Sequence, residues 1–217
     1  MYQKGLTGEQ NLQAIGNLAP YSAGGVGFDN RYEGVKGSSR LFEKLLPSFL
    51  KVKGQDYYLQ LETDIDLATS TLIFIHPKTG KMLSLPAGMV TEVVIKSDGI
   101  EQIFRTTTGS DFEKGSEGQR FFQVLKDGKF QFIKVPSKKF IEADYKGVYT
   151  ADRRYDEYET KYKYYIIGND SAYHKITLNK KSLMKLFPDK KELINSIIGQ
   201  GPFTNDEEMV ISVLEKF

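Results

Sequence analysis

The hydrophobic periodicity of the chain changes near residue 179. Between residues 48 and 178, apolar and polar residues mostly alternate with the period of two that is typical of half-buried strands. After residue 179, the apolar residues recur at the three- and four-residue spacing of amphipathic helices. The sequence therefore predicts a mainly β fold with a small α tail. We expect an antiparallel β-meander, curved or barrel-like, with a C-terminal helical hairpin packed on it.

Turn signals support antiparallel pairing of neighbouring strands. Asp98-Gly99 and Asp127-Gly128 are two-residue pairs that tolerate the positive φ of tight hairpins. Longer turns are predicted at 53–56, 77–80 and 168–171. A polar, Gly-containing stretch at 106–118 is predicted to be a mobile loop, with Phe112 as its anchor.

Three regions are predicted to form a single folding unit. Residues 1–47 contain too many Gly and Pro for long regular structure, so they are expected to form an irregular arm packed on the domain. Residues 48–178 form the β domain and residues 179–217 the helical tail. The apolar stripe of the tail predicts burial of Leu193, Ile197, Val213 and Leu214.

Composition excludes several classes of site. The chain has 217 residues, a net charge of +2 and no Cys, so bulk electrostatics favour no nucleic-acid partner, and thiolate metal sites and disulfides are excluded. No apolar run approaches the roughly 20 residues of a membrane-spanning helix, so the protein is not expected to span a membrane. His76 and His174 do not have metal-ligand spacing and are interpreted as an exposed turn residue and a strand-surface residue. We expect no metal and no cofactor.

Two clusters of polar or aromatic residues have the composition of a possible site. Glu62, Asp64 and Asp66 share one strand face, but successive residues on a face are about 6.5–7 Å apart, so a solvated face is expected. A Tyr-rich segment with interleaved Arg, Lys, Asp and Glu follows residue 152. Its exposed rings would offer contact area at low entropic cost, which makes it a candidate ligand surface. The residues of this surface are Tyr155, Tyr158, Tyr162 and Tyr164.

Two motifs resemble a known family. The segment KKSLMKLFPDKK at 180–191 resembles the C-terminal signature of an uncharacterised family of exported proteins of Gram-negative bacteria. The segment DNRYEGVKGS at 29–38 resembles the N-terminal motif of the same family. The chain departs from that pattern at Ser39-Arg40, which replaces a Pro-aromatic pair. The resemblance implies a periplasmic or extracellular location after removal of a signal peptide, and it implies no catalytic residues. The chain start itself lacks the apolar core of a signal peptide, so a cytoplasmic location is the alternative.

The leading functional hypothesis is that the protein is a non-enzymatic binding or assembly protein, located in the envelope or secreted. Its partner would be a protein or a carbohydrate. One alternative is a carrier that holds a small apolar ligand inside a curved sheet. The other is a hydrolase that uses carboxylate or Ser chemistry in a cleft under residues 106–118. Sequence alone leaves these three open.

Overall fold

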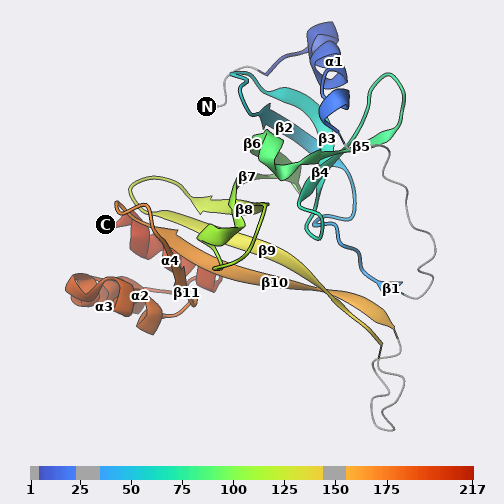
Figure 1. Ribbon diagram of the computed structural model, residues 1–217. Coiled ribbons are helices and arrows are strands. Elements are labelled where there is room, and N and C mark those ends of the chain that lie inside the picture. Colours follow the sequence, from blue (N-terminus) through green and yellow to red (C-terminus); the bar gives the residue numbers. More distant parts are fainter. Residues whose placement is uncertain (1–4, 23–34, 144–154) are drawn as a thin grey trace.

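The computed structural model describes residues 5–22, 35–143 and 155–217, and it confirms a mainly β fold (Figure 1). The strands are β1 (Val35–Lys36), β2 (Leu46–Val52), β3 (Leu59–Asp66), β4 (Thr71–Ile75), β5 (Met82–Pro86), β6 (Val90–Ser97), β7 (Ile100–Thr108), β8 (Gln119–Lys126), β9 (Gln131–Ile141), β10 (Asp156–Ile167) and β11 (Tyr173–Ile176). The α-helices are α1 (Gly8–Gly16), α2 (Lys180–Leu186), α3 (Lys191–Gly199) and α4 (Asp206–Glu215). Short 3₁₀ turns are η1 (Ala19–Tyr21), η2 (Ala87–Met89), η3 (Gly109–Asp111) and η4 (Pro188–Lys190).

The strands form one sheet in the order β1-β10-β9-β8-β7-β6-β2-β3-β4-β5, with β11 also paired to β10. Two runs of consecutive hairpins, β2 to β5 and β6 to β10, are joined where β6 returns to pair with β2. All pairs are antiparallel except β1 with β10, which is parallel. The sheet is curved, and within the described residues it does not close into a barrel, because β5 at one end of the order pairs with neither β1 nor β11 at the other end.

The N-terminal half of the sheet encloses one hydrophobic core. Alternate residues of β2 point into it, and α1 covers it with Ile15, followed by Leu18. The buried Asn11 fixes this helix, since its side chain donates to the carbonyl of Gln60 at 2.7 Å and accepts from the Gln60 N–H at 2.8 Å. The described part of residues 1–47 contacts the core through Ile15 and Leu18, and it contains the regular elements α1 and β1. Residues 29–34 of the N-terminal motif lie outside the described residues.

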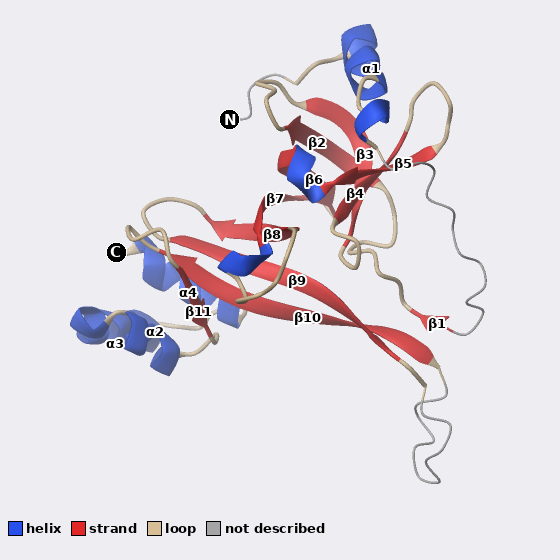
Figure 2. Ribbon diagram, viewed as in Figure 1, coloured by secondary structure: helices blue, strands red, loops and turns tan. Residues whose placement is uncertain are grey.

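The C-terminal helices cover the opposite end of the sheet, beside β9, β10 and β11 (Figure 2). Asparagine side chains cap two of them, because Asn179 accepts from the Ser182 N–H and Asn205 from the Glu208 N–H. Of the four predicted core residues, Ile197, Val213 and Leu214 are buried. The prediction for Leu193 is wrong: it is 39% exposed, and the next residue on the helix, Ile194, points into the core instead.

The long hairpin of β9 and β10 projects beyond the rest of the sheet as a twisted ribbon (Figure 1). Strand β8 pairs with β9 only as far as Lys134, whereas β9 and β10 remain paired up to Ile141. A register shift in β8, between Val124 and Lys126, precedes the divergence. The sheet therefore divides at this point, with β8 on one side and the β9–β10 hairpin on the other.

Candidate functional site

A cleft of about 310 Å³ lies at the division between β8 and β9. Four consecutive residues of β9, at 135–138, line it, although successive side chains of a strand point to opposite faces. The cleft therefore runs along the edge of β9 rather than against one of its faces. Pro136 is the second residue of β9 beyond the pairing with β8, and proline is tolerated in a strand where its nitrogen faces an unpaired edge.

The β3–β4 turn forms one rim of the cleft, and its backbone is fixed by hydrogen bonds. The Asp66 carboxylate accepts from the N–H groups of Ala68 and Thr69, both at 2.9 Å, and from the Ser39 hydroxyl at 2.7 Å. Ser70 closes the turn at a φ of 53° and contributes its side chain to the cleft. The rim is therefore built before any ligand binds.

The connection from β7 to β8 forms the second rim, and aromatic contacts hold it. Phe112 lies 5.3 Å from each of the Tyr165 and Tyr173 rings, and its carbonyl accepts from the Tyr165 hydroxyl at 3.1 Å. Gly109 is needed at the base, since a Cβ there would come within 2.7 Å of Ser116 Oγ. The predicted loop thus begins later than expected, after β7 ends at Thr108, and Phe112 is its anchor as predicted.

The cleft is lined by three cations and one carboxylate. Lys163 Nζ lies 2.8 Å from Glu113 Oε2, and this contact lowers the pKa of Glu113 and raises that of Lys163. Arg120 Nη1 donates to Ser70 Oγ at 2.7 Å and, within the described part of the chain, forms no ion pair. The side chain of Lys138 is only 8% exposed. Its Nζ lies 3.8 Å from Oε1 of Glu43, which is a long distance for an ion pair. Two cations are therefore left with little compensation by neighbouring acids.

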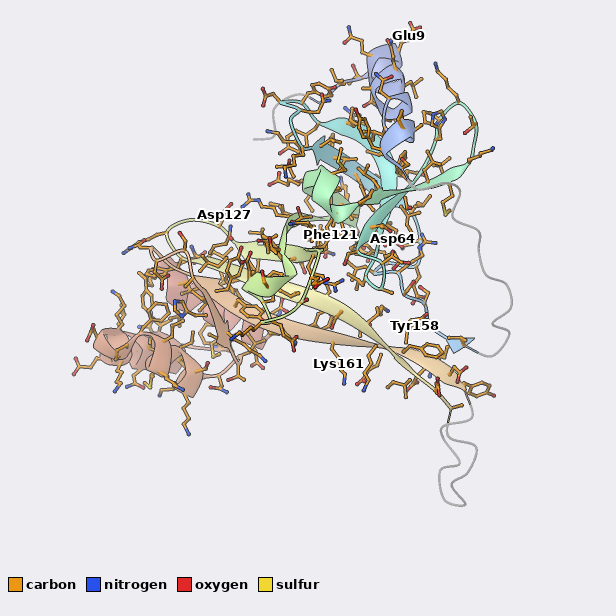
Figure 3. The ribbon with its side chains drawn as sticks, viewed as in Figure 1. Glu9, Asp64, Phe121, Asp127, Tyr158 and Lys161 are labelled. Atoms are coloured by element: carbon orange, nitrogen blue, oxygen red, sulfur yellow. The ribbon has the colours of Figure 1, made fainter. Side chains whose placement is uncertain are left out.

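This chemistry suits the binding of an anion. A ligand carboxylate near Lys138 and Arg120 would add attraction that the 3.8 Å contact with Glu43 and the Ser70 hydroxyl supply only in part. Apolar side chains complete the walls, among them Leu67, Phe121 and Val135. Phe121 lies where β8 approaches the N-terminal half of the sheet (Figure 3).

The cleft lies beneath the β7–β8 connection, where the hydrolase alternative expected its site. Three serines line it, Ser70, Ser116 and Ser137, and no histidine is among its lining residues. In the described part of the chain, no group of three or more acidic or histidine side chains is placed to hold a metal ion. The cleft thus offers hydroxyls and cations for binding, and its one carboxylate is engaged by Lys163.

The four predicted tyrosines occupy different environments. Tyr155 is 61% exposed and immediately precedes β10, while Tyr158 packs edge-on against Phe140 with 5.1 Å between the ring centroids. Tyr162 is 47% exposed and lies under Lys134, whose Nζ is 4.5 Å from the ring centroid. Tyr164 donates its hydroxyl to Glu207 at 2.7 Å, and burial together with this bond raises its pKa. Three of them, all except Tyr155, share one face of β10.

The predicted acidic face is wrong at Asp64, which is fully buried. Its carboxylate accepts from Arg40 Nε at 2.9 Å and from the backbone N–H groups of Phe42 and Ile65. Burial raises the pKa of the Asp64 carboxyl above its ordinary value, although the contacts with Phe42, Ile65 and Arg40 each lower it. The segment before β2 lies over this end of β3, which explains why alternation alone misplaced the residue.

Of the two predictions about histidines, the one for His76 is wrong and the one for His174 is correct. His76 is buried rather than exposed, and its Nδ1 accepts from the backbone N–H groups of Lys78 and Thr79. His174 lies on β11 as expected, partly exposed, with Nε2 2.7 Å from Asp170 Oδ2.

Sequence reasoning expected a cleft under residues 106–118 only in the hydrolase alternative. It did not identify the residues that line the cleft, because they come from four separate segments of the chain. One signal was present: Pro136 interrupts an otherwise good strand, which indicates an unpaired edge. Arg120 and Lys138 carry no local pattern that distinguishes them from other surface cations.

No protein-family model, curated protein or solved structure matches this chain. In the described part of the chain, no helix has both the length and the apolar character needed to cross a membrane.

Proposed function

We propose that the protein is a binding module whose divided sheet captures an extended, acidic segment of a partner protein. The observation that carries the proposal is the combination of two unpaired strand edges with two poorly compensated cations in one cleft. A peptide bound there would add a strand to the sheet, a common mode of peptide recognition.

The backbone supports the extended conformation of the ligand. On the β8 side, residues 119–122 pair with β7 but not with β9, and on the other side residues 135–138 pair with β10 alone within the described chain. Both edges therefore present backbone N–H and C=O groups that a ligand backbone can use. Main-chain hydrogen bonds of this kind supply affinity for an extended chain largely independently of its sequence.

The side chains support the acidic character of the ligand. Arg120 and Lys138 lie on opposite sides of the cleft, one on β8 and one on β9, so an acidic residue between them would meet both. Leu67, Phe121 and Val135 favour apolar residues at intervening positions. The best ligand therefore alternates acidic and apolar side chains.

Binding is tested with two labelled hexapeptides, a Glu-Val repeat and a Lys-Val repeat, by fluorescence anisotropy at low ionic strength. We expect the Glu-Val peptide to bind and the Lys-Val peptide not to bind. Arg120→Gln and Lys138→Gln should each weaken binding about tenfold, which corresponds to about 1.4 kcal/mol.

The matched control is Lys139→Gln, which removes the same charge from the next residue along β9, an exposed side chain outside the cleft. It should leave affinity unchanged apart from a small salt-dependent effect. Equal losses for Lys138→Gln and Lys139→Gln would show that only net charge matters, which would contradict a defined site.

We also propose that the module acts in the bacterial envelope or outside the cell. The support is the resemblance of residues 180–191 and 29–38 to the motifs of an exported family. Fractionation of Gram-negative cells that express the native gene, followed by detection with an antibody, tests the location. Recovery from the cytoplasm alone would overturn this part of the proposal.

A further inference from the structure

The outer edge of β10 is open along its middle. At one end, β1 pairs with residues 156–157, and at the other end β11 pairs with residues 164–167. Between them, residues 158–163 pair with β9 on the inner side, and no described strand occupies the outer side. Alternate residues of this segment direct their N–H and C=O groups outward, so the edge can accept another antiparallel strand.

The charges along this edge reverse in sign about Thr160. Residues 157–163 read Glu-Tyr-Glu-Thr-Lys-Tyr-Lys. Each Glu before Thr160 therefore has a Lys at the same distance after it, and the two Tyr are also equally spaced about Thr160. If a second copy of the segment pairs antiparallel with Thr160 opposite Thr160, Glu159 lies opposite Lys161 and Tyr158 opposite Tyr162. Every contact in this register joins opposite charges, two rings or two hydroxyls, and such pairs stabilise a sheet.

Other registers of the same two strands are unfavourable. A shift of the pairing centre by one residue toward the C-terminus places Lys161 opposite Lys161, and the equal shift in the other direction places Glu159 opposite Glu159. Like charges directly opposite one another destabilise a strand pair. Lysine on an open edge ordinarily discourages pairing, but here it permits one register and opposes its neighbours.

The side chains are accessible for this contact. Lys161 and Glu159 are 51% and 46% exposed, and Lys161 points away from the hairpin in Figure 3. They already contact one another within the chain, with 3.1 Å between Nζ and Oε2. A second copy would complete a network of four alternating charges on one face, with Tyr158 and Tyr162 of both copies on the other.

We propose that the protein forms a two-fold symmetric dimer by antiparallel pairing of the β10 edges, centred on Thr160. The two sheets then become one continuous sheet, and the interface is self-complementary, as a two-fold dimer requires. Five residues of strand from each copy form a small contact compared with the roughly 1,200–2,000 Å² of stable interfaces. The dimer is therefore weak and concentration-dependent.

Analytical ultracentrifugation tests this with charge reversals. The wild-type chain should move from 24.6 kDa towards twice that mass as concentration rises. Glu159→Lys and Lys161→Glu should each weaken dimerisation about tenfold or more. The double variant Glu159→Lys/Lys161→Glu restores opposite charges across the axis, and it should recover the dimer.

The matched control is Lys96→Glu, an exposed lysine that pairs with Glu101 on β7, away from β10. It makes the same change in net charge as Lys161→Glu and should leave the mass distribution unchanged. A wild-type chain that stays monomeric at all concentrations would overturn the proposal. So would a dimer that survives both single reversals, or a double variant that remains as monomeric as the singles.

Disulfide trapping tests the register separately, and the chain has no native Cys to interfere. In the proposed dimer, residues directly opposite each other have Cα atoms about 4.5–5.5 Å apart, within the range that a disulfide can bridge. Thr160→Cys should therefore cross-link rapidly under mild oxidation. Lys161→Cys should cross-link at least about tenfold more slowly, because its copies lie on a diagonal about 7–8 Å apart. Equal rates for the two variants would contradict pairing centred on Thr160.

Discussion

Arg120 Nη1 donates a hydrogen bond of 2.7 Å to Ser70 Oγ, and this contact links β8 to the β3–β4 turn across 50 residues of sequence. It holds the guanidinium at the mouth of the cleft without neutralising its charge, because a hydroxyl accepts the bond. The arrangement explains how a cation can be both ordered and free to bind an anion.

Substitution of Ser70 tests whether that hydrogen bond orders the site. Ser70→Ala should weaken Glu-Val peptide binding by a few-fold, because Arg120 becomes less ordered while its charge remains. The free energy of unfolding should fall by no more than about 1 kcal/mol, since the bond is only part-buried. Anisotropy and urea unfolding measure the two effects. Loss of binding as complete as that of Arg120→Gln would instead place Ser70 in direct contact with the ligand.

The buried Asp64 should be one of the most sensitive polar positions. Asp64→Ala leaves Arg40, with a side chain 14% exposed, without this carboxylate and removes the acceptor of two backbone N–H groups. We expect a loss of about 3–5 kcal/mol in urea unfolding. Glu62→Ala, an exposed position on the same strand, is the control and should change stability by less than about 0.5 kcal/mol. Similar small effects at both positions would show that the Asp64 contacts do not stabilise the fold.

The helical tail should stabilise the protein through its buried residues only. Leu214→Ala should cost about 2–4 kcal/mol because the side chain is 3% exposed. Leu193→Ala, from the same tail but 39% exposed, should cost less than about 1 kcal/mol. Chemical denaturation distinguishes them, and equal losses would contradict the packing of α3 and α4 described above.

Two neighbouring tyrosines of the predicted ligand surface should respond differently to loss of the hydroxyl. Tyr164→Phe removes the hydrogen bond to Glu207 and should reduce stability by about 1.5 kcal/mol. Tyr162→Phe should change stability by less than about 0.5 kcal/mol, because the ring, not the hydroxyl, contacts Lys134. Thermal unfolding of the two variants measures the difference. If Tyr162→Phe is the more destabilising variant, the assignment of these roles is wrong.

The Lys163–Glu113 contact predicts a pH dependence for the β7–β8 connection. The contact lowers the pKa of Glu113 below its ordinary value of 4.5, so the folded state holds this carboxylate ionised more strongly than the unfolded chain does. Its stabilising effect is therefore fully present above pH 4.5 and is lost as the pH falls through the lowered pKa. NMR titration of the Glu113 carboxyl should show this midpoint, and Lys163→Met should move it upward. An unchanged midpoint in that variant would show that Lys163 does not hold the carboxylate in solution.

Much of the fold follows from local patterns. Alternation and turn signals predicted the antiparallel meander, and the apolar spacing after residue 179 predicted the helices that cover it. The errors at Asp64 and Leu193 have different causes. Asp64 is buried by residues 40–42, and Leu193 is exposed because the geometry of α3 gives the buried position to Ile194.

The residues that line the cleft could not be predicted, because they depend on where strand pairing ends. Alternation within β8 and β9 is the same whether the two strands remain paired or diverge. Only Pro136 marks the divergence in the sequence, and it does not identify Arg120 and Lys138 as neighbours. The reversal of charge about Thr160 is visible in the sequence. The pairing of two copies can be inferred from it only once the structure shows that this segment forms an open edge.

The most direct test of the proposed function is an NMR titration of backbone amides with the Glu-Val hexapeptide. We predict that the resonances that change are concentrated at residues 119–122, 135, 137 and 138, on the two facing edges of the cleft, and that the Lys-Val peptide leaves them unchanged. Changes located elsewhere, or equal changes with both peptides, would contradict the capture of an acidic strand at the division of the sheet.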